Sequence, residues 1–143
     1  MKIFLTITLI ALAISVNAQD TTSNLFTDKE EAISHAQKNE TQILMVFAGS
    51  DWCRPCIQFK KEILLNDEFK TYANANLTVL YLDFPSKKKN QLSKIETTQN
   101  ESLAEEFNKS GSFPKIILTD MNLSDPKEIS FKNQSVQAFI SEL

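Results

Sequence analysis

The sequence is poor in the residues that many sites require. Its 143 residues include two cysteines, two glycines, one histidine and one tryptophan. Two glycines cannot build a Gly-rich phosphate loop, so nothing supports nucleotide binding. Two cysteines and His35 fall short of the four Cys or His ligands usual for zinc, and we expect no metal site. Because 15 basic residues face 18 acidic ones, a basic nucleic-acid surface is not expected either.

Long hydrophobic runs are also scarce. The apolar run from Ile3 to Val16 is shorter and more polar than the roughly 20 apolar residues of a membrane-spanning helix. It follows Lys2 and ends in small residues, which is typical of a signal peptide of residues 1–18 cut after Ala18. We therefore expect an exported, periplasmic or secreted domain of residues 19–143, with no membrane span after cleavage.

The remaining pattern predicts one α/β domain. Short apolar runs predict buried strands, and spacings of three and four predict helices. Helices between the early strands favour parallel pairing, and a short turn between the last two strands favours an antiparallel hairpin. Thr27 and Glu30 fit a capping box, and residues 19–27 are expected to be irregular. The predicted helices are 28–38, 53–65, 67–73, 91–109 and 135–143, and the predicted strands are 42–47, 77–83, 115–120 and 129–131.

Both cysteines lie in the stretch "DWCRPC", between a predicted strand and a helix. A bridge between Cys53 and Cys56 closes a very small loop and would stabilise the chain little, which favours redox chemistry over a structural disulfide. At a helix N-terminus, beside Arg54, the Cys53 thiolate is stabilised and should be accessible to attack. Pro55 suits the first helical turn, Cys56 is placed to resolve a mixed disulfide, and Trp52 offers an apolar docking surface.

Two stretches together resemble the thioredoxin superfamily, in particular its exported thioredoxin-like members. These are "VFAGSDWCRPC" after one strand and "SGSFPK" before another. The resemblance implies a thioredoxin fold, with a central mixed sheet of four to five strands flanked by helices. It also implies a cis bond before Pro114, facing the sulfurs, and a Phe113 backbone that pairs with an extended substrate. No bound cofactor is implied.

The chain departs from the family pattern at several positions. Arg-Pro replaces the common Gly-Pro between the cysteines, Lys115 replaces the usual threonine, and the loop before the motif is one residue longer. The strand at 42–47 lacks the buried acid that accepts the proton of the resolving thiol in the family. Asp51 or Glu62 could replace that acid through water.

These features predict an exported reductase of protein disulfides, acting as a monomer and recharged by a membrane electron donor. Arg54 favours the thiolate and hence an oxidant, so a disulfide-forming oxidase or an isomerase is the first alternative. A non-enzymatic module that holds a partner chain or a metal is the second. The sequence does not specify the substrate or the electron donor.

Overall fold

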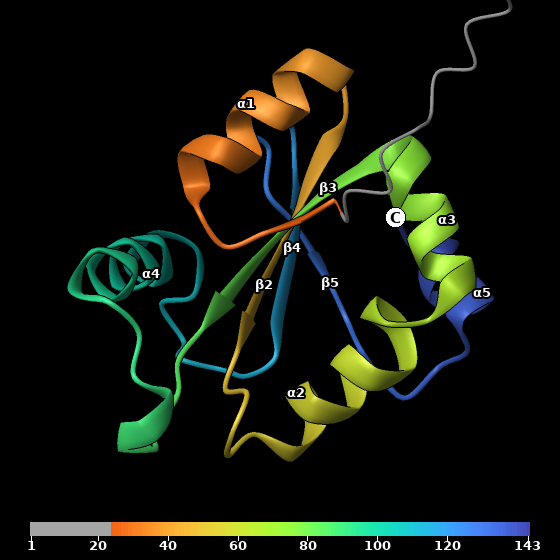
Figure 1. Ribbon diagram of the computed structural model, residues 1–143. Helices are drawn as coiled ribbons and strands as arrows, with labels where there is room; N and C mark the ends of the chain where they lie inside the picture. The colour runs from red at the N-terminus through yellow and green to blue at the C-terminus, as the bar shows by residue number, and fades with distance from the viewer. Residues whose placement is uncertain (1–23) are drawn as a thin grey trace, which may run out of the picture.

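The computed structural model describes residues 24–143, which form a five-stranded sheet with helices on both faces (Figure 1). The predicted signal peptide lies outside these residues. No helix of the described part combines the length and the hydrophobicity that a bilayer crossing requires. The strand order is β1-β3-β2-β4-β5. The strands are β1 Leu25–Phe26, β2 Gln42–Ala48, β3 Leu77–Asp83, β4 Lys115–Thr119 and β5 Lys127–Ile129.

Five α-helices cover the sheet in two layers. In Figure 1, α1 and α4 lie on one side of the sheet, and α2, α3 and α5 lie on the other. A π-helical turn continues α2, and a 3₁₀ turn precedes α4. The helices are α1 Lys29–Asn39, α2 Arg54–Phe59, α3 Asp67–Asn76, α4 Lys94–Phe107 and α5 Val136–Ile140; the π turn is Lys60–Leu64 and the 3₁₀ turn is Lys88–Asn90.

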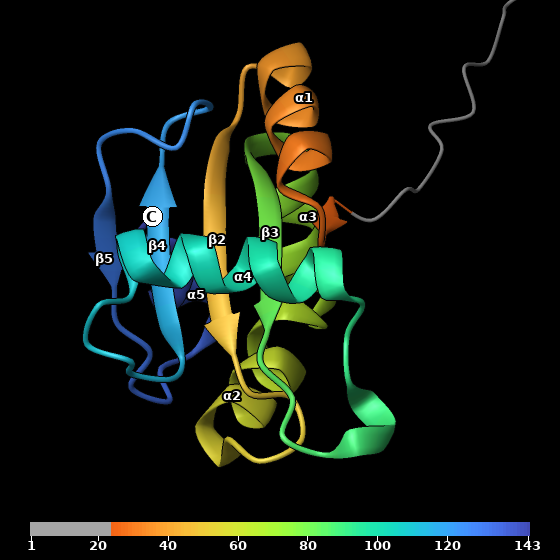
Figure 2. The same cartoon turned by 90° about the vertical axis from the view of Figure 1, so that its left-hand side faces the viewer.

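The pairing of the strands brings two of them to the same end of the sheet. β3 pairs in parallel with β1 and β2, whereas β4 pairs antiparallel with β2 and β5. This confirms the predicted mixed sheet. Figure 2 shows the arrowheads of β2 and β3 side by side, both directed toward α2. The residues that follow β2 and β3 therefore meet at this end of the sheet.

The β2 strand is buried on both faces. Leu44, Val46 and Ala48 pack in the cluster under α2, α3 and α5. Ile43 and Met45 pack in the cluster under α1 and α4. Full burial of such a side chain contributes about 1.5–3 kcal/mol, which explains why β2 is apolar at every position after the exposed Gln42.

Several predicted boundaries were wrong. The cap of α1 is Asp28, not Thr27: the Asp28 carboxylate accepts the Glu31 N–H at 2.9 Å. β1 forms within residues that were predicted to be irregular. It consists of two residues paired with β3, and a strand this short has no recognisable sequence pattern. The last strand ends at Ile129 rather than at Phe131, whose ring packs against Phe59 at 5.1 Å.

Candidate active site

The two cysteines form a disulfide at the start of α2. Their Cα atoms are 5.3 Å apart. Cys53 is the N-cap residue of α2, and its sulfur accepts the Cys56 N–H at 3.3 Å. Pro55 lies in the first helical turn, where no backbone N–H is needed. The predicted placement of Cys53 at a helix N-terminus is therefore confirmed.

The burial of Cys53 differs from the expectation. Cys53 is 5% exposed and Cys56 is 1% exposed. Cys53, the predicted attacking residue, is thus less exposed than the sequence suggested, because it packs in the same hydrophobic cluster as Val46 and Ala48. Its neighbours Trp52, Arg54 and Pro55 are exposed and border it on the surface.

Gly49, the residue after β2, allows the indole of Trp52 to lie against the backbone at the C-terminal end of this strand. A Cβ atom at Gly49 would lie 2.3 Å from Cε2 of Trp52, closer than any real contact allows. The Gly49 carbonyl also accepts the Cys53 N–H at 2.9 Å. The small residue after β2 therefore fixes both the indole and the turn into α2.

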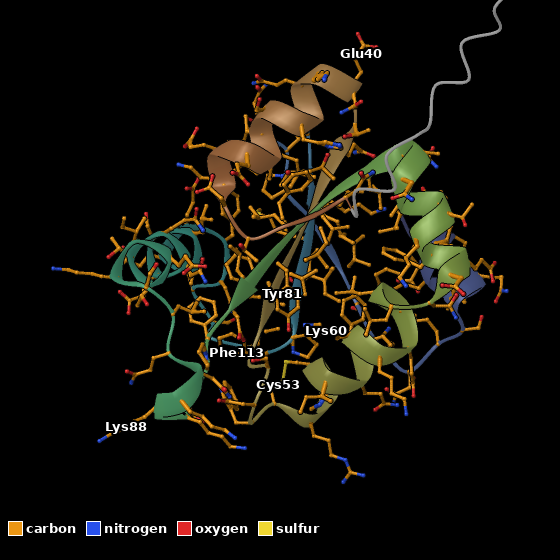
Figure 3. All side chains as sticks on the ribbon, in the orientation of Figure 1. Glu40, Cys53, Lys60, Tyr81, Lys88 and Phe113 are labelled. Carbon is orange, nitrogen blue, oxygen red and sulfur yellow. A yellow bond between two sulfur atoms is a disulfide. The ribbon has the colours of Figure 1, made fainter. Side chains whose placement is uncertain are left out.

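Three aromatic side chains gather beside the disulfide. Nε1 of Trp52 donates a hydrogen bond to the Phe84 carbonyl at 2.7 Å. The Phe113 ring meets the Trp52 ring edge-on, with 5.4 Å between centroids, and meets the Phe84 ring at the same distance. Trp52 is 49% exposed, so an apolar surface borders the sulfurs. Figure 3 shows Phe113 and Cys53 at the same end of the sheet.

The peptide bond between Phe113 and Pro114 is cis, as the resemblance implied. The next residue, Lys115, pairs with Phe47 near the end of β2, the strand that leads to the disulfide. Both Phe113 and Pro114 are half-buried. The structure thus brings together at one end of the sheet the residues that the sequence predicted to shape the site.

Two carboxylates hold the loop before the disulfide to the loop after β3. The Asp83 carboxylate accepts the Ser50 N–H at 2.9 Å and the Ser50 hydroxyl at 2.6 Å. The Asp51 carboxylate accepts the N–H groups of Ser86 at 2.9 Å and of Lys87 at 3.0 Å, and the amide of Asn90 at 2.9 Å. These bonds, led by the one from Ser86, lower the pKa of Asp51 to about 2.

Neither acid suggested by the sequence is well suited to take a proton from Cys56. Asp51 is a weak base because its oxygens already accept the hydrogen bonds of the loop after β3. Glu62 is exposed, and its carboxylate accepts the side-chain amide of Gln58 at 3.2 Å. The structural use of Asp51 depends on a contact between two loops, which the sequence alone did not reveal.

Sequence analysis missed Tyr81 and Lys60. Tyr81 is 5% exposed, and among the described residues its hydroxyl is the buried side-chain N or O atom without a hydrogen-bond partner. Nζ of Lys60 lies 4.7 Å from the centre of the Tyr81 ring. Burial, followed by the charge of Asp83, raises the pKa of Tyr81 to about 12. The one available signal was a polar residue inside the apolar run of β3.

Residues 29–123, more than half of the chain, match the family model of a thioredoxin-like domain. The chain belongs to the thioredoxin-like family. The fold suggested by "DWCRPC" and by the later proline is thereby confirmed, and the five strands agree with the predicted mixed sheet. Among residues 24–143 of this thioredoxin-like protein, no three Cys, His, Asp or Glu side chains converge as metal ligands would.

Two proteins of Chlamydia pneumoniae are similar in sequence to this thioredoxin-like chain. The disulfide bond reductase DsbH is 29% identical over 113 residues, which are 79% of this chain and 66% of DsbH. The thioredoxin-related protein DsbJ is 40% identical over 42 residues, which are 29% of this chain and 12% of DsbJ. The chain therefore spans just under two thirds of DsbH and a small part of DsbJ.

Solved structures of thioredoxin-like proteins are also similar to this chain. A DsbH oxidoreductase structure superposes with a TM-score of 0.68 at 29% identity, covering 79% of this chain and 76% of that one. A thioredoxin from Thermus thermophilus superposes with a TM-score of 0.59 at 16% identity, covering 82% of each chain. The second likeness supports the fold alone.

Proposed function

We propose that this protein is a thiol–disulfide oxidoreductase that reduces protein disulfides. The observation that carries the proposal is the Cys53–Cys56 disulfide at the N-terminus of α2, beside the Phe113–Pro114 bond. A small loop closed by this bridge adds little stability, whereas the position favours thiolate chemistry. The similarity to a protein named disulfide bond reductase supports the direction.

In the proposed reaction the two cysteines act in turn. The Cys53 thiolate attacks one sulfur of a substrate disulfide and forms a mixed disulfide, and the other substrate sulfur leaves and takes a proton. Cys56 then loses its proton, and its thiolate attacks Sγ of Cys53. The Cys53–Cys56 bond forms, and the second substrate sulfur leaves as a thiolate and takes up a proton that replaces the one lost by Cys56. The substrate has then gained two electrons and two protons.

Site geometry suggests how a substrate chain docks. We assign Trp52, Arg54 and Pro55 to one side of the docking surface, because they are exposed and flank Cys53. We assign Phe113 and Pro114 to the other side, with the Phe113 backbone pairing to an extended substrate segment. The edge-on contact between the Trp52 and Phe113 rings joins the two sides.

Cysteine variants test the activity. Cys53→Ser should abolish the reduction of insulin by dithiothreitol-recharged protein, whereas Cys56→Ser should stop after the first attack and retain covalent partners. Retained turnover in Cys53→Ser would overturn the proposal. If the double variant Cys53→Ser/Cys56→Ser kept its function in cells, a binding module would be the better explanation.

The direction of the reaction needs a separate measurement. An oxidase or isomerase remains the second candidate because exposed Arg54 next to Cys53 favours the thiolate and therefore the reduced form. Equilibration with glutathione decides between them. A reduction potential near the −270 mV of thioredoxin supports a reductase, and one near the −120 mV of DsbA supports an oxidase.

The sequence also supports export, and the compartment determines which redox partners the protein can meet. We infer cleavage after Ala18, action as a monomer, and recharging by a membrane electron donor on the far side of the membrane. N-terminal sequencing of the protein recovered from the periplasm or the medium should begin at Gln19. Protein that keeps residues 1–18 and stays in the cytoplasm would contradict this inference.

A further inference from the structure

The Tyr81 hydroxyl is an unusual group for the interior of this domain. A buried hydroxyl without a hydrogen-bond partner costs free energy, so such groups are rare in folded proteins. Among the described residues it is the one buried side-chain N or O atom in this condition. In the oxidised form the Tyr81 hydroxyl therefore keeps a donor that no group of the described residues accepts.

Tyr81 lies on the face of the sheet that packs against the redox helix. It pairs with Val46 on β2, and Val46 pairs with Ile116 on β4, two residues after Pro114. All three side chains belong to the same buried cluster as Cys53 and Cys56. The Tyr81 side chain thus packs in the same hydrophobic cluster as the disulfide.

Lys60 connects Tyr81 to the turn of helix that carries Cys56. The Lys60 backbone N–H donates to the Cys56 carbonyl, so Lys60 lies one turn after the cysteine. Its ammonium lies 4.7 Å from the centre of the Tyr81 ring. Figure 3 shows Tyr81, Lys60 and Cys53 on the same side of the sheet, between the strands and α2.

Lys60 also reaches water. It is half-buried and lines a pocket of about 470 Å³, together with Leu64 and Val79. Val79 precedes Tyr81 by two residues on β3 and packs in the same cluster. A charge at Lys60 is therefore solvated on one side while it faces the Tyr81 ring on the other.

We infer that the Tyr81 hydroxyl donates a hydrogen bond to the Cys56 sulfur once the disulfide opens, with the Lys60 ammonium stabilising the resulting thiolate. The inference rests on the dithiol chemistry proposed above. A disulfide sulfur is a poor acceptor, which accounts for a hydroxyl without a partner in the oxidised form. A thiolate is a strong acceptor, and a charge-assisted bond to it is the stronger kind.

The proposed bond assists the second step of the reaction. Cys56 must lose its proton before its sulfur attacks Sγ of Cys53, and the proton passes through water to the departing substrate sulfur. Tyr81 keeps its own proton throughout, in agreement with the raised pKa of its hydroxyl. The charged groups near it are Lys60 from the π turn and Asp83 from β3. The pair would thus support the resolving thiol in a chain whose β2 strand has no acid.

Tyr81→Phe removes one oxygen atom and tests the inference directly. We expect the pKa of the Cys56 thiol, followed by ¹³C NMR of the reduced protein, to rise. Loss of a bond that exists only in the reduced form should shift the equilibrium with glutathione about tenfold toward the disulfide, or about 30 mV more negative. With a glutathionylated peptide as probe, acid quenching should show the mixed disulfide lasting roughly tenfold longer.

Tyr72→Phe is the matched control, because Tyr72 packs on the same cluster from α3. It should leave the Cys56 pKa, the potential and the lifetime of the mixed disulfide as in the unmodified protein. Lys60→Met keeps the apolar stem over the ring and should shift the same three quantities in the direction of Tyr81→Phe. Folding is not at risk in Tyr81→Phe, since the change removes an unpaired buried polar group.

The outcomes separate this inference from the proposed function. The Cys56 pKa and the potential are measured without substrate. If both shift in Tyr81→Phe while insulin is not reduced by the unmodified protein, the reductase proposal fails and the inference stands. If insulin is reduced and Tyr81→Phe matches Tyr72→Phe in all three quantities, the inference is overturned.

Discussion

Nε1 of Trp52 donates a hydrogen bond to the carbonyl oxygen of Phe84 at 2.7 Å, so the residue before the redox pair is fixed to the residue that follows β3. Half of the indole surface is exposed, so this bond restrains a side chain that packing covers only in part. Its edge-on contact with Phe113 extends the link to the residue before the cis bond. One aromatic side chain therefore joins three separate segments around the disulfide.

Removal of the Trp52 ring should weaken the docking of protein substrates. An aromatic contact is worth about 0.5–1.5 kcal/mol, so Trp52→Ala should raise KM for insulin roughly threefold to tenfold. The rate with a small disulfide, which does not need the docking surface, should change little. Ile95→Ala is the control, because Ile95 is 81% exposed on α4, away from the disulfide. An equal loss with both substrates would show that Trp52 acts on the sulfurs instead.

Replacement of Gly49 should disturb the indole before it disturbs anything else. The new Cβ of Gly49→Ala would clash with the Trp52 ring at 2.3 Å, and overpacking of this kind costs about 1–3 kcal/mol. Urea unfolding measures the loss, and fluorescence of the single tryptophan reports the moved ring.

A double-mutant cycle identifies the cause of that loss. With Trp52→Ala already present, Gly49→Ala should cost much less, because the ring that it meets is gone. A penalty that is the same in both backgrounds would point to the turn after β2 rather than to the indole.

The residues to which we assign the chemistry could be predicted from the sequence because they are close along the chain. Cys53 and Cys56 share one turn of helix, and the segment around Pro114 precedes a clear apolar strand. Their meeting at one end of the sheet follows from the antiparallel pairing of β2 with β4, which places Lys115 opposite Phe47. The resemblance to the thioredoxin superfamily, rather than the pattern alone, implied that the Pro114 segment faces the sulfurs.

Contacts that depend on the register of the strands or on the path of a loop could not be predicted from the sequence. Tyr81 faces Lys60 because of how β3 aligns with β2 and because a π turn follows α2, and neither feature has a period in the sequence. The bonds from Ser86 and Asn90 to Asp51 depend on the path of an irregular loop. A strand as short as β1 shows no alternation at all.

Protonation of Asp51 should loosen the loop beside the disulfide in acid. The folded pKa, about 2, is below the ordinary 3.8, so this carboxylate contributes stability that is fully present above about pH 4. The contribution is lost as the pH falls from 4 toward 2. Urea unfolding across that range should show a smaller pH dependence for Asp51→Asn.

Glu105→Gln serves as the control for Asp51→Asn. Glu105 is an exposed carboxylate of α4 for which the described residues provide no hydrogen-bond donor. The control should keep the pH dependence of the unmodified protein between pH 4 and 2. If Asp51→Asn kept it as well, the bonds from Ser86, Lys87 and Asn90 would not be stabilising the charged form.

His35 should make stability fall at mildly acid pH, in a range separate from that of Asp51. Nδ1 of His35 lies 2.8 Å from the Thr78 hydroxyl, and its ring packs 4.8 Å from the Phe26 ring. Burial, followed by the charge of Lys38, lowers the pKa of His35 below 6.5. The unfolded chain therefore binds the proton first, and stability decreases as the pH falls below about 6.5.

The variant His35→Gln tests this prediction. The dependence of its unfolding free energy on pH between 7 and 5 should be weaker than in the unmodified protein. The redox potential of the Cys53–Cys56 pair should stay unchanged, because His35 lies on α1, across the sheet from the disulfide. An unaltered slope would show that the imidazole titrates alike in the folded and unfolded chains.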